Sequence, residues 1–193
     1  MVIHSREHKR SFAELGDDEV ELVAEAWSQR RAAQPEGYLH AIVNEGQDAG
    51  ASLAHSHSQL VWLPEAPPAV IEETGSLAVS PGTEVGRFRN ASAVCSAAGR
   101  VPYELLIESA SPGDAFGADL PAAMNLLRNV IQRLRAVEGP VPWNAWLHVR
   151  AGDWHIEVVP RLTVFAGLEL GAGLFVNPLP PETAAERLRA AGP

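Results

Sequence analysis

The segment from Asn44 to Gln59 constrains the fold most, because it sets a polar loop between two apolar runs, 38–43 and 60–63. Apolar runs of this length on either side of a loop that carries Gly and Ser predict two neighbouring strands. Side chains two residues apart point to the same face of a strand. Three alternating polar residues at the end of the loop are therefore expected to point into one pocket: His55, His57 and Gln59.

The composition of this loop favours phosphate binding. Gly46, Gly50 and Ser52 leave backbone N–H groups uncovered by large side chains, and such groups can surround phosphate oxygens. A neutral imidazole can attack phosphorus, and a neighbouring amide such as that of Gln59 can hold the oxygens or orient the ring. The pattern indicates phosphoryl or nucleotidyl transfer. The alternatives are a chance pair of histidines on a surface strand and a metal-binding pair.

Length and composition limit the class of protein. The 193 residues, 46% hydrophobic and 20% charged, are typical of a globular protein with one core or two small ones. The chain has neither a run of about 18 apolar residues nor a signal peptide, so we expect no membrane partner and a cytoplasmic location. The formal net charge of −9 argues against a nucleic-acid partner. The single cysteine, Cys95, excludes an internal disulfide and a multi-cysteine zinc site.

Hydrophobic spacing and turn residues predict both helices and strands. Apolar residues recur at helical spacing over about 17–33, after a capping-box sequence at Ser11 to Glu14, and again between Asp119 and Gly139. The other expected elements are strands at 1–5, 88–97, 103–109, 143–149 and 154–159, a short helix or turn at 70–73, a Gly-rich passage at 167–173 and a final helix at about 181–190.

The order of the loop residues resembles a known active-site signature. The matching pieces are Asn44-Glu-Gly, Gly50-Ala-Ser52 and His55-Ser-His57-Ser-Gln59. Together they are similar to the signature of galactose-1-phosphate uridylyltransferases, the two-repeat branch of the histidine triad superfamily. The resemblance implies that His57 is the nucleophile that carries the nucleotidyl group and that Gln59 contacts the transferred phosphate. It assigns the lining of the phosphate site to Asn44, Gly50 and Ser52.

His55 is the first histidine of this signature. In the family the corresponding residue joins two cysteines in a metal site, and this chain has no cysteine pair. We therefore expect His55 to orient the loop or to hydrogen-bond near His57. Ser56 stands where the family often has Pro.

The two halves of the chain repeat a strand, helix and strand that end in His57-Ser-Gln59 and in His155-Ile-Glu157. With the resemblance, this implies an α+β fold of two histidine-triad-like repeats, 1–74 and 75–193, each an antiparallel sheet with packed helices. Only the second repeat has an opening hairpin, so we expect the chain to start inside an incomplete first repeat. The resulting open sheet edge needs another chain or a different kind of packing to cover it, and we expect a homodimer.

The resemblance also implies a structural metal site for zinc or iron. By the match, its ligands are Glu73, His148, His155 and Glu157, and Glu157 replaces a histidine found in some members. Histidine and carboxylate groups suit either metal. The alternative is a hydrogen-bonded buried polar cluster without a metal. Two further positions resemble residues that reach the sugar end of the substrate: Glu169 and Asn177.

The activity implied by the resemblance is that of a nucleotidyltransferase of galactose metabolism. It would act on a nucleoside-diphosphate sugar and a sugar 1-phosphate by double displacement through a nucleotidyl-His57 intermediate. One alternative is a catalytically impaired remnant or nucleotide-binding subunit, because the resemblance covers only the later part of a family member. The second alternative is a histidine-triad nucleotide hydrolase or phosphorylase, with water or phosphate as acceptor.

Overall fold

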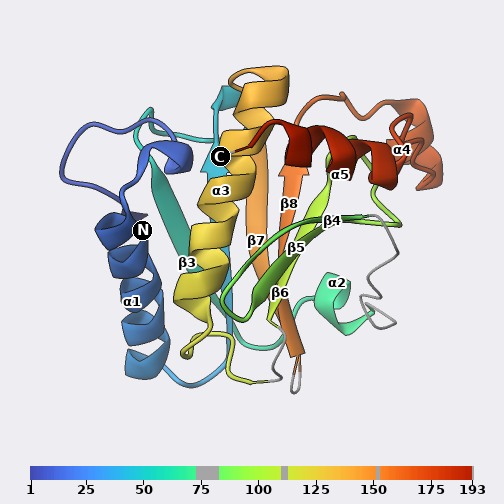
Figure 1. Ribbon diagram of the computed structural model, residues 1–193. Coiled ribbons are helices and arrows are strands. Elements are labelled where there is room, and N and C mark those ends of the chain that lie inside the picture. The colour runs from blue at the N-terminus through green and yellow to red at the C-terminus, as the bar shows by residue number, and fades with distance from the viewer. Residues whose placement is uncertain (73–82, 110–112, 151–152, 193) are drawn as a thin grey trace.

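An eight-stranded antiparallel sheet forms the centre of the protein (Figure 1). The structure is a computed structural model that describes residues 1–72, 83–109, 113–150 and 153–192. The strand order is β1-β3-β2-β7-β8-β6-β5-β4. The strands are β1 (Val2–Ile3), β2 (Tyr38–Glu45), β3 (His57–Leu63), β4 (Glu84–Phe88), β5 (Ala91–Cys95), β6 (Leu105–Ser109), β7 (Trp143–Arg150) and β8 (Asp153–Pro160). This antiparallel sheet with packed helices confirms the predicted α+β class.

Three helices cover one face of the sheet. α1 (Asp17–Ala33), α3 (Leu120–Glu138) and α5 (Pro181–Ala190) lie in front of the strands in Figure 1. The shorter helices are η1 (Phe12–Glu14), η2 (Gln47–Ala49), α2 (Pro68–Ile71) and α4 (Gly167–Ala172). Apolar side chains of the three long helices and of the strands beneath them form one core, in which Trp27 and Trp143 are among the largest fully buried residues.

Local hydrogen bonds fix where the first helices begin. The Glu19 carboxylate accepts a hydrogen bond from the Gly16 N–H at 2.7 Å, at the start of α1. Acidic residues in the first turn complement the positive end of the helix dipole. The expected capping residue Ser11 instead caps η1, because its hydroxyl oxygen accepts a hydrogen bond from the Ala13 N–H at 3.1 Å.

Alternation along the strands separates two faces of the sheet. The three long helices cover the core face, and we call the opposite face the open face because none of these three helices lies on it. Val43 of β2 is buried in the core and pairs with Ser58 of β3. Ser58 therefore also points toward the helices, and its Oγ accepts a hydrogen bond from Trp27 Nε1 at 2.9 Å. Since successive side chains of a strand point in opposite directions, His57 and Gln59 point to the open face.

The two halves of the chain share this sheet, because β2 pairs with β7 and places Ile42 opposite Trp146. The expected domain boundary between residues 74 and 75 lies outside the described residues, and the division into two repeats stays a prediction. In the described ranges, no helix has both the length and the apolar character needed to cross a membrane.

Several helices and strands have other bounds in the structure than the sequence predicts. The expected strand 88–97 is divided between β4 and β5 by a turn at Arg89, whose φ is 51°. The expected strand 103–109 begins only at Leu105, because Tyr103 has a φ of 58° that an extended strand does not allow. The Gly-rich passage 167–173 contains α4, and part of the expected linker 75–86 belongs to β4.

Candidate active site

His57 is the first residue of β3, and its side chain is almost fully enclosed, with 1% of its surface exposed. Its Nδ1 lies 2.8 Å from the carbonyl oxygen of His55. A carbonyl oxygen only accepts hydrogen bonds, so Nδ1 carries a proton, and in the neutral form of the ring Nε2 keeps its lone pair. Nε2 is buried and has no hydrogen-bond partner among the described residues. The ring is therefore held in the tautomer that a nucleophile needs.

Side-chain amides flank His57 on the open face. The register that pairs Val43 with Ser58 sets Asn44 beside His57, one step further along β2. Gln59 follows two residues after His57 on the same face and is half-buried. The prediction that Asn44, His57 and Gln59 contact one phosphate group is consistent with this arrangement and stays a prediction.

Asn144 of β7 holds the loop against the sheet. Its Nδ2 donates hydrogen bonds to Asn44 Oδ1 at 2.8 Å and to the Ala49 carbonyl oxygen at 2.7 Å. Since the amide oxygen of Asn44 accepts this bond, its NH₂ group is left to donate elsewhere. Asn144 thus fixes both the position of the loop and the orientation of a donor beside His57.

Two glycines determine the path of the loop after β2. Gly46 has a φ of 87°, and a Cβ at this position would lie 2.8 Å from Cβ of Pro142. Gly50 has a φ of 81° in open space. Residues other than Gly rarely adopt such positive φ values, so the path of this loop depends on Gly at both positions. Ser52, two residues after Gly50, is exposed.

The N-terminal segment packs against the turn that precedes His57. The His4 N–H donates to the Ser56 carbonyl at 3.1 Å, and the Ser56 N–H donates to the Lys9 carbonyl at 2.7 Å. His4 Nδ1 lies 2.8 Å from Ser56 Oγ. Burial, together with the nearby His57 and His55 rings, lowers the pKa of His4 to about 3. His4 is therefore neutral when it contacts the Ser56 hydroxyl, and this contact helps to hold the turn before His57.

His55 lies apart from the other two polar residues of the motif. It precedes β3, and its Nε2 lies 3.1 Å from the Ser5 carbonyl oxygen. Its ring packs edge-on against His8, with the ring centroids 5.4 Å apart. The expectation of three side chains in one pocket thus differs from the structure, because the chain becomes extended only at His57. The backbone carbonyl of His55, rather than its ring, contacts His57.

Ser52 lines a hollow of about 670 Å³ beside the loop, together with Arg10, Gly46 and Arg135. His57 and Gln59 are not among its lining residues. The hollow places two guanidinium groups next to the glycine-containing loop, but Glu14 and Glu45 also line it, and Glu14 forms an ion pair with Arg135 at 3.3 Å. The predicted role of Ser52 in lining the phosphate site stays a prediction.

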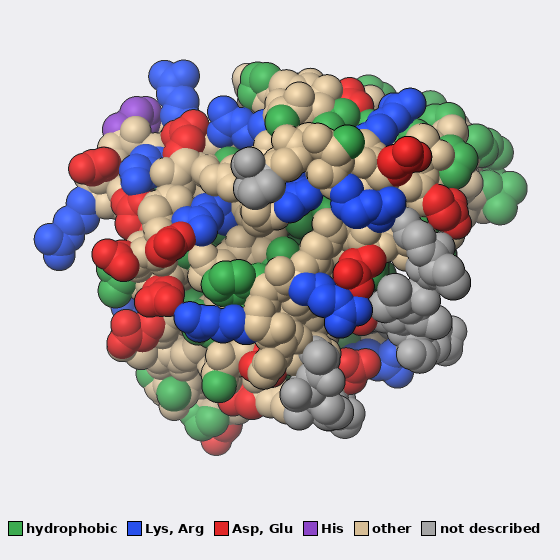
Figure 2. Space-filling view, viewed as in Figure 1, with side chains coloured by type: hydrophobic (Ala, Val, Ile, Leu, Met, Phe, Trp, Pro, Cys, Tyr) green, Lys and Arg blue, Asp and Glu red, His purple; other side chains and the backbone are tan. Residues whose placement is uncertain are grey.

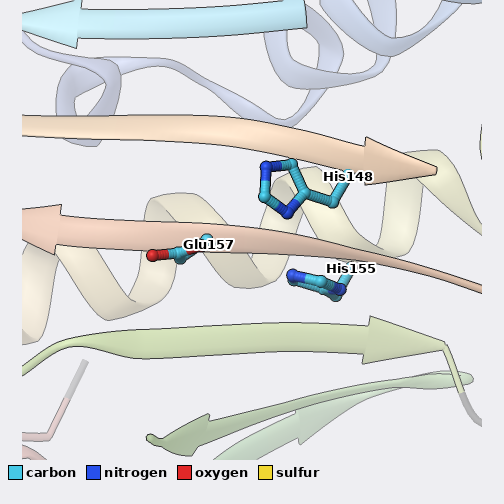
Figure 3. A group of neighbouring side chains, drawn as sticks. All are labelled: His148, His155 and Glu157. Atoms are coloured by element: carbon cyan, nitrogen blue, oxygen red, sulfur yellow. The ribbon is translucent and has the colours of Figure 1, made fainter. Parts of the chain in front are cut away.

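A second group of titratable side chains lies further along the open face (Figure 3). His148 of β7 and His155 and Glu157 of β8 lie side by side, and one ligand atom of each is within 4.8 Å of the others. Burial lowers the pKa of His148 to about 4, with contributions from His40 and Arg100. Two imidazoles and a carboxylate are a donor set that zinc or iron accepts.

Arg100 contacts the same carboxylate. Its Nη2 forms an ion pair with Glu157 Oε1 and another with Glu104 at 3.2 Å. The other oxygen of Glu157 accepts a hydrogen bond from Trp146 Nε1 at 3.1 Å. Both oxygens of Glu157 therefore have donors, and a metal that binds this group has to displace Arg100.

The remaining predicted residues lie elsewhere. Asn177 Nδ2 donates to the carbonyl oxygens of Gly99 at 3.1 Å and Val101 at 2.9 Å. The Glu169 carboxylate accepts a hydrogen bond from the Ala166 N–H at 2.9 Å, at the start of α4. Both side chains are used within the protein, and their sugar-binding role stays a prediction. The predicted metal ligand Glu73 lies outside the described residues.

Sequence reasoning missed three residues that support these sites: His4, Arg100 and Asn144. Asn144 carried one signal, since it is a polar residue within an apolar strand sequence. His4 and Arg100 carried none, because their partners Ser56 and Glu157 lie 52 and 57 residues away in the chain.

The part of the chain that contains the His57 loop is similar to a known protein family. Residues 1–67 match the family described as galactose-1-phosphate uridyl transferase, N-terminal domain. The first 67 residues of the chain thus resemble a uridylyltransferase domain. A solved uridylyltransferase structure has the same fold as this protein, with a TM-score of 0.82 and 24% identity, over 98% of this chain and 73% of that one. The predicted resemblance is thereby confirmed.

The chain is also similar to a plant enzyme. It is 28% identical over 180 residues to ADP-glucose phosphorylase of Arabidopsis thaliana, an alignment that covers 79% of this chain and 51% of the relative. A crystal structure of an ADP-glucose phosphorylase from Arabidopsis thaliana with bound ADP-glucose matches with a TM-score of 0.84 and 25% identity, over 97% of this chain and 71% of that one. The chain spans about half the length of this curated relative.

Proposed function

We propose that this uridylyltransferase-like protein transfers a nucleotidyl group from a nucleoside-diphosphate sugar to a phosphate-bearing acceptor. The observation that carries the proposal is the His57 ring, whose Nδ1 proton is held by the His55 carbonyl and whose Nε2 has no partner among the described residues. The similarity to uridylyltransferases and to ADP-glucose phosphorylase supports this class of substrate.

The first half-reaction forms a nucleotidyl-histidine. Nε2 of His57 attacks the α-phosphorus, an N–P bond forms, and the bond from that phosphorus to the bridging oxygen breaks. The sugar 1-phosphate leaves with the electron pair of the broken bond. The ring then carries a positive charge, and the His55 carbonyl stabilises it through the Nδ1 proton. The amides of Asn44 and Gln59 and the N–H groups of the loop donate to the phosphoryl oxygens.

The second half-reaction returns His57 to its starting state. An oxygen of the acceptor attacks the phosphorus, the N–P bond breaks, and Nε2 recovers its lone pair. A sugar 1-phosphate as acceptor completes a uridylyltransferase-like exchange. The similarity to ADP-glucose phosphorylase favours inorganic phosphate as a second candidate acceptor.

Covalent labelling tests the proposal. The protein is incubated with UDP-glucose or ADP-glucose labelled at the α-phosphate, without acceptor, and then with galactose 1-phosphate, inorganic phosphate or buffer. We expect acid-labile label on the wild-type protein, none on His57→Gly, and release of label by one of the two acceptors. Undiminished labelling of His57→Gly contradicts the mechanism. No labelling and no rise in Tm with millimolar nucleotide sugar supports the impaired remnant instead.

We also propose that His148, His155 and Glu157 hold a structural zinc or iron ion, with Glu73 as the fourth ligand implied by the family resemblance. The close approach of the three described donor atoms supports this proposal. The ion would link β7 to β8 and would take no part in the transfer. Elemental analysis tests it. We expect near-stoichiometric metal in the wild type and its loss in His155→Gln, whereas wild-type protein without metal leaves Arg100 as the cation of the cluster.

We further propose that the protein forms a homodimer through the segment 162–176. α4 has no buried residue, and Figure 2 shows hydrophobic side chains gathered at the upper right, where α4 lies in Figure 1. The exposed apolar residues of the segment are Leu162, Val164, Leu168, Leu170, Leu174, Phe175 and Val176. In sedimentation experiments, Leu170→Asp should give monomers, while Leu22→Asp, at another exposed leucine on α1, should leave a dimer. A monomeric wild type contradicts the proposal.

A further inference from the structure

A hollow of about 350 Å³ lies between α3, the start of α1 and the turn after β4. It is on the helix side of the sheet, because Phe88, which lines it, pairs with the core residue Ala91. His57 faces the other side. Four arginines line the hollow: Arg87, Arg89, Arg128 and Arg133. They are four of only 15 Lys and Arg residues in a chain with a formal net charge of −9, and Figure 2 shows blue side chains around the middle of this face.

Arginine and asparagine side chains of α3 contribute hydrogen-bond donors to the lining of the hollow. Arg133 Nε donates to Asn129 Oδ1 at 2.7 Å, and Arg133 Nη1 donates to the Leu188 carbonyl at 3.2 Å. Because the amide oxygen of Asn129 is used, its NH₂ group is left as a donor. Arg133 forms no ion pair with a carboxylate in the described part of the chain. Nε of Arg128 is also buried without a partner among these residues.

The turn between β4 and β5 adds a strained arginine and an exposed aromatic ring. Arg89 has a φ of 51°, a conformation that costs a residue other than Gly roughly 1–2 kcal/mol. Its guanidinium lies 5.3 Å from the centroid of the Phe88 ring, and Phe88 is 40% exposed. The turn therefore places a guanidinium group and an aromatic ring at the rim of the hollow.

Nearby carboxylates pair with two of the four arginines, Arg87 and Arg128. Asp17 accepts from Arg128 at 2.5 Å, and Glu21 is the only other carboxylate among the lining residues. Arg87 pairs with Glu84 at 2.6 Å, which leaves Arg89 and Arg133 without a carboxylate partner among the described residues. A ligand that satisfies this lining has to carry several acceptor oxygens and negative charge.

We propose that this hollow binds a small phosphorylated anion, with its phosphate groups held by Arg89, Arg133 and Asn129. Guanidinium groups match the geometry and charge of phosphate oxygens and bind them through paired N–H donors. The Phe88 ring offers a stacking surface to a ligand that also carries a base. The site lies on the opposite face of the sheet from His57, and it does not rest on the chemistry proposed for that residue.

Titration of the full chain with inorganic pyrophosphate tests the proposal. Chemical-shift changes in amide NMR spectra should appear at 86–91 and 125–133, and calorimetry gives the Kd. Arg89→Asn keeps a residue that tolerates the positive φ while removing the cation. We expect Arg89→Asn and Arg133→Gln each to weaken binding about tenfold, in line with the loss of one charge-assisted hydrogen bond. ADP in place of pyrophosphate shows whether the Phe88 ring strengthens binding.

Arg30→Gln is the matched control, since Arg30 is exposed on α1 and does not line this hollow. It should bind pyrophosphate as the wild type does, and the Tm of every variant confirms that it is folded. The proposal is overturned if no binding occurs at millimolar pyrophosphate. It is also overturned if shifts appear only at 44–59, if sulfate at the same ionic strength binds equally well, or if the two variants keep the wild-type Kd.

Discussion

His57 and His155 both stand on the open face of the same sheet, but their surroundings differ. His57 contacts a backbone carbonyl through Nδ1 and is flanked by the neutral amides of Asn44 and Gln59. His155 stands opposite His148 and close to Glu157, whose carboxylate is paired with Arg100. One region combines a single imidazole with uncharged donors, and the other combines two imidazoles with a carboxylate and a cation.

The comparison shows that the partner of the second ring nitrogen decides what a histidine can do. A carbonyl on Nδ1 of His57 leaves a lone pair on Nε2 for a bond to phosphorus. Carboxylates beside His148 and His155 instead favour a cation, either a metal or the Arg100 guanidinium. Substitutions around His57 should therefore mainly change activity, whereas substitutions around His155 should mainly change stability.

The largest expected effect separates the two regions by activity. His57→Gly should lower nucleotidyl transfer by about a thousandfold or more, because the covalent route is lost, and its Tm shows whether the variant is folded. His155→Gln should lower activity by less than about tenfold and mainly lower Tm. Initial rates with nucleotide sugar, measured beside melting curves, check both. Equal losses of activity would remove the distinction between the regions.

The next effect concerns the support of His57 and depends on pH. The pKa of His4 is lowered to about 3 from 6.5, so the folded state disfavours the proton that the unfolded state binds. The stability that neutral His4 provides is full above pH 6.5 and is lost as the pH falls from 6.5 toward 3, by on the order of 4 kcal/mol.

His4→Gln, which has no titrating group, should flatten this part of the stability profile. Urea unfolding at several pH values measures it, and His8→Gln, at an exposed histidine of the same segment, serves as the control. A wild-type profile that matches His4→Gln between pH 6.5 and 4 would show that His4 is not held neutral.

A smaller effect tests the charged region. Arg100→Gln leaves the carboxylates of Glu104 and Glu157 without their guanidinium partner, and Glu104 is only 6% exposed. We expect a loss of roughly 2 kcal/mol in the free energy of unfolding of metal-free protein. Added zinc should restore the Tm of the variant, because Glu157 is then available as a ligand. A variant as stable as the wild type in chelator would show that this ion pair contributes nothing.

The smallest effect concerns the loop beside His57. Asn144→Ala removes the hydrogen bonds to Asn44 and to the Ala49 carbonyl, which should cost about 1–2 kcal/mol in the free energy of unfolding. The Asn44 amide can then rotate, so KM should rise several-fold more than kcat falls. Gln29→Ala, at an exposed position of α1, is the control, and an unchanged KM for Asn144→Ala would exclude a role for Asn144 in positioning the loop.

The sequence alone determined the parts of the molecule that follow from local pattern. The helical spacing of apolar residues predicted α1 with its observed bounds, and the final helix, α5, also has the bounds expected from the sequence. Alternation with a period of two placed His57 and Gln59 on one face, as the register of β3 confirms. These predictions succeeded because backbone geometry repeats over a few residues, whatever the rest of the chain does.

The tertiary structure alone decided which distant groups meet. The contacts of His4 with Ser56 and of Arg100 with Glu157 depend on strand register and loop path, and no local pattern records either. The prediction of one strand at 88–97 was wrong for the same reason. The turn at Arg89 has an unfavourable φ that only its surroundings maintain. Local propensities act over a few residues, whereas the free energy that selects these contacts comes from packing the whole sheet against its helices.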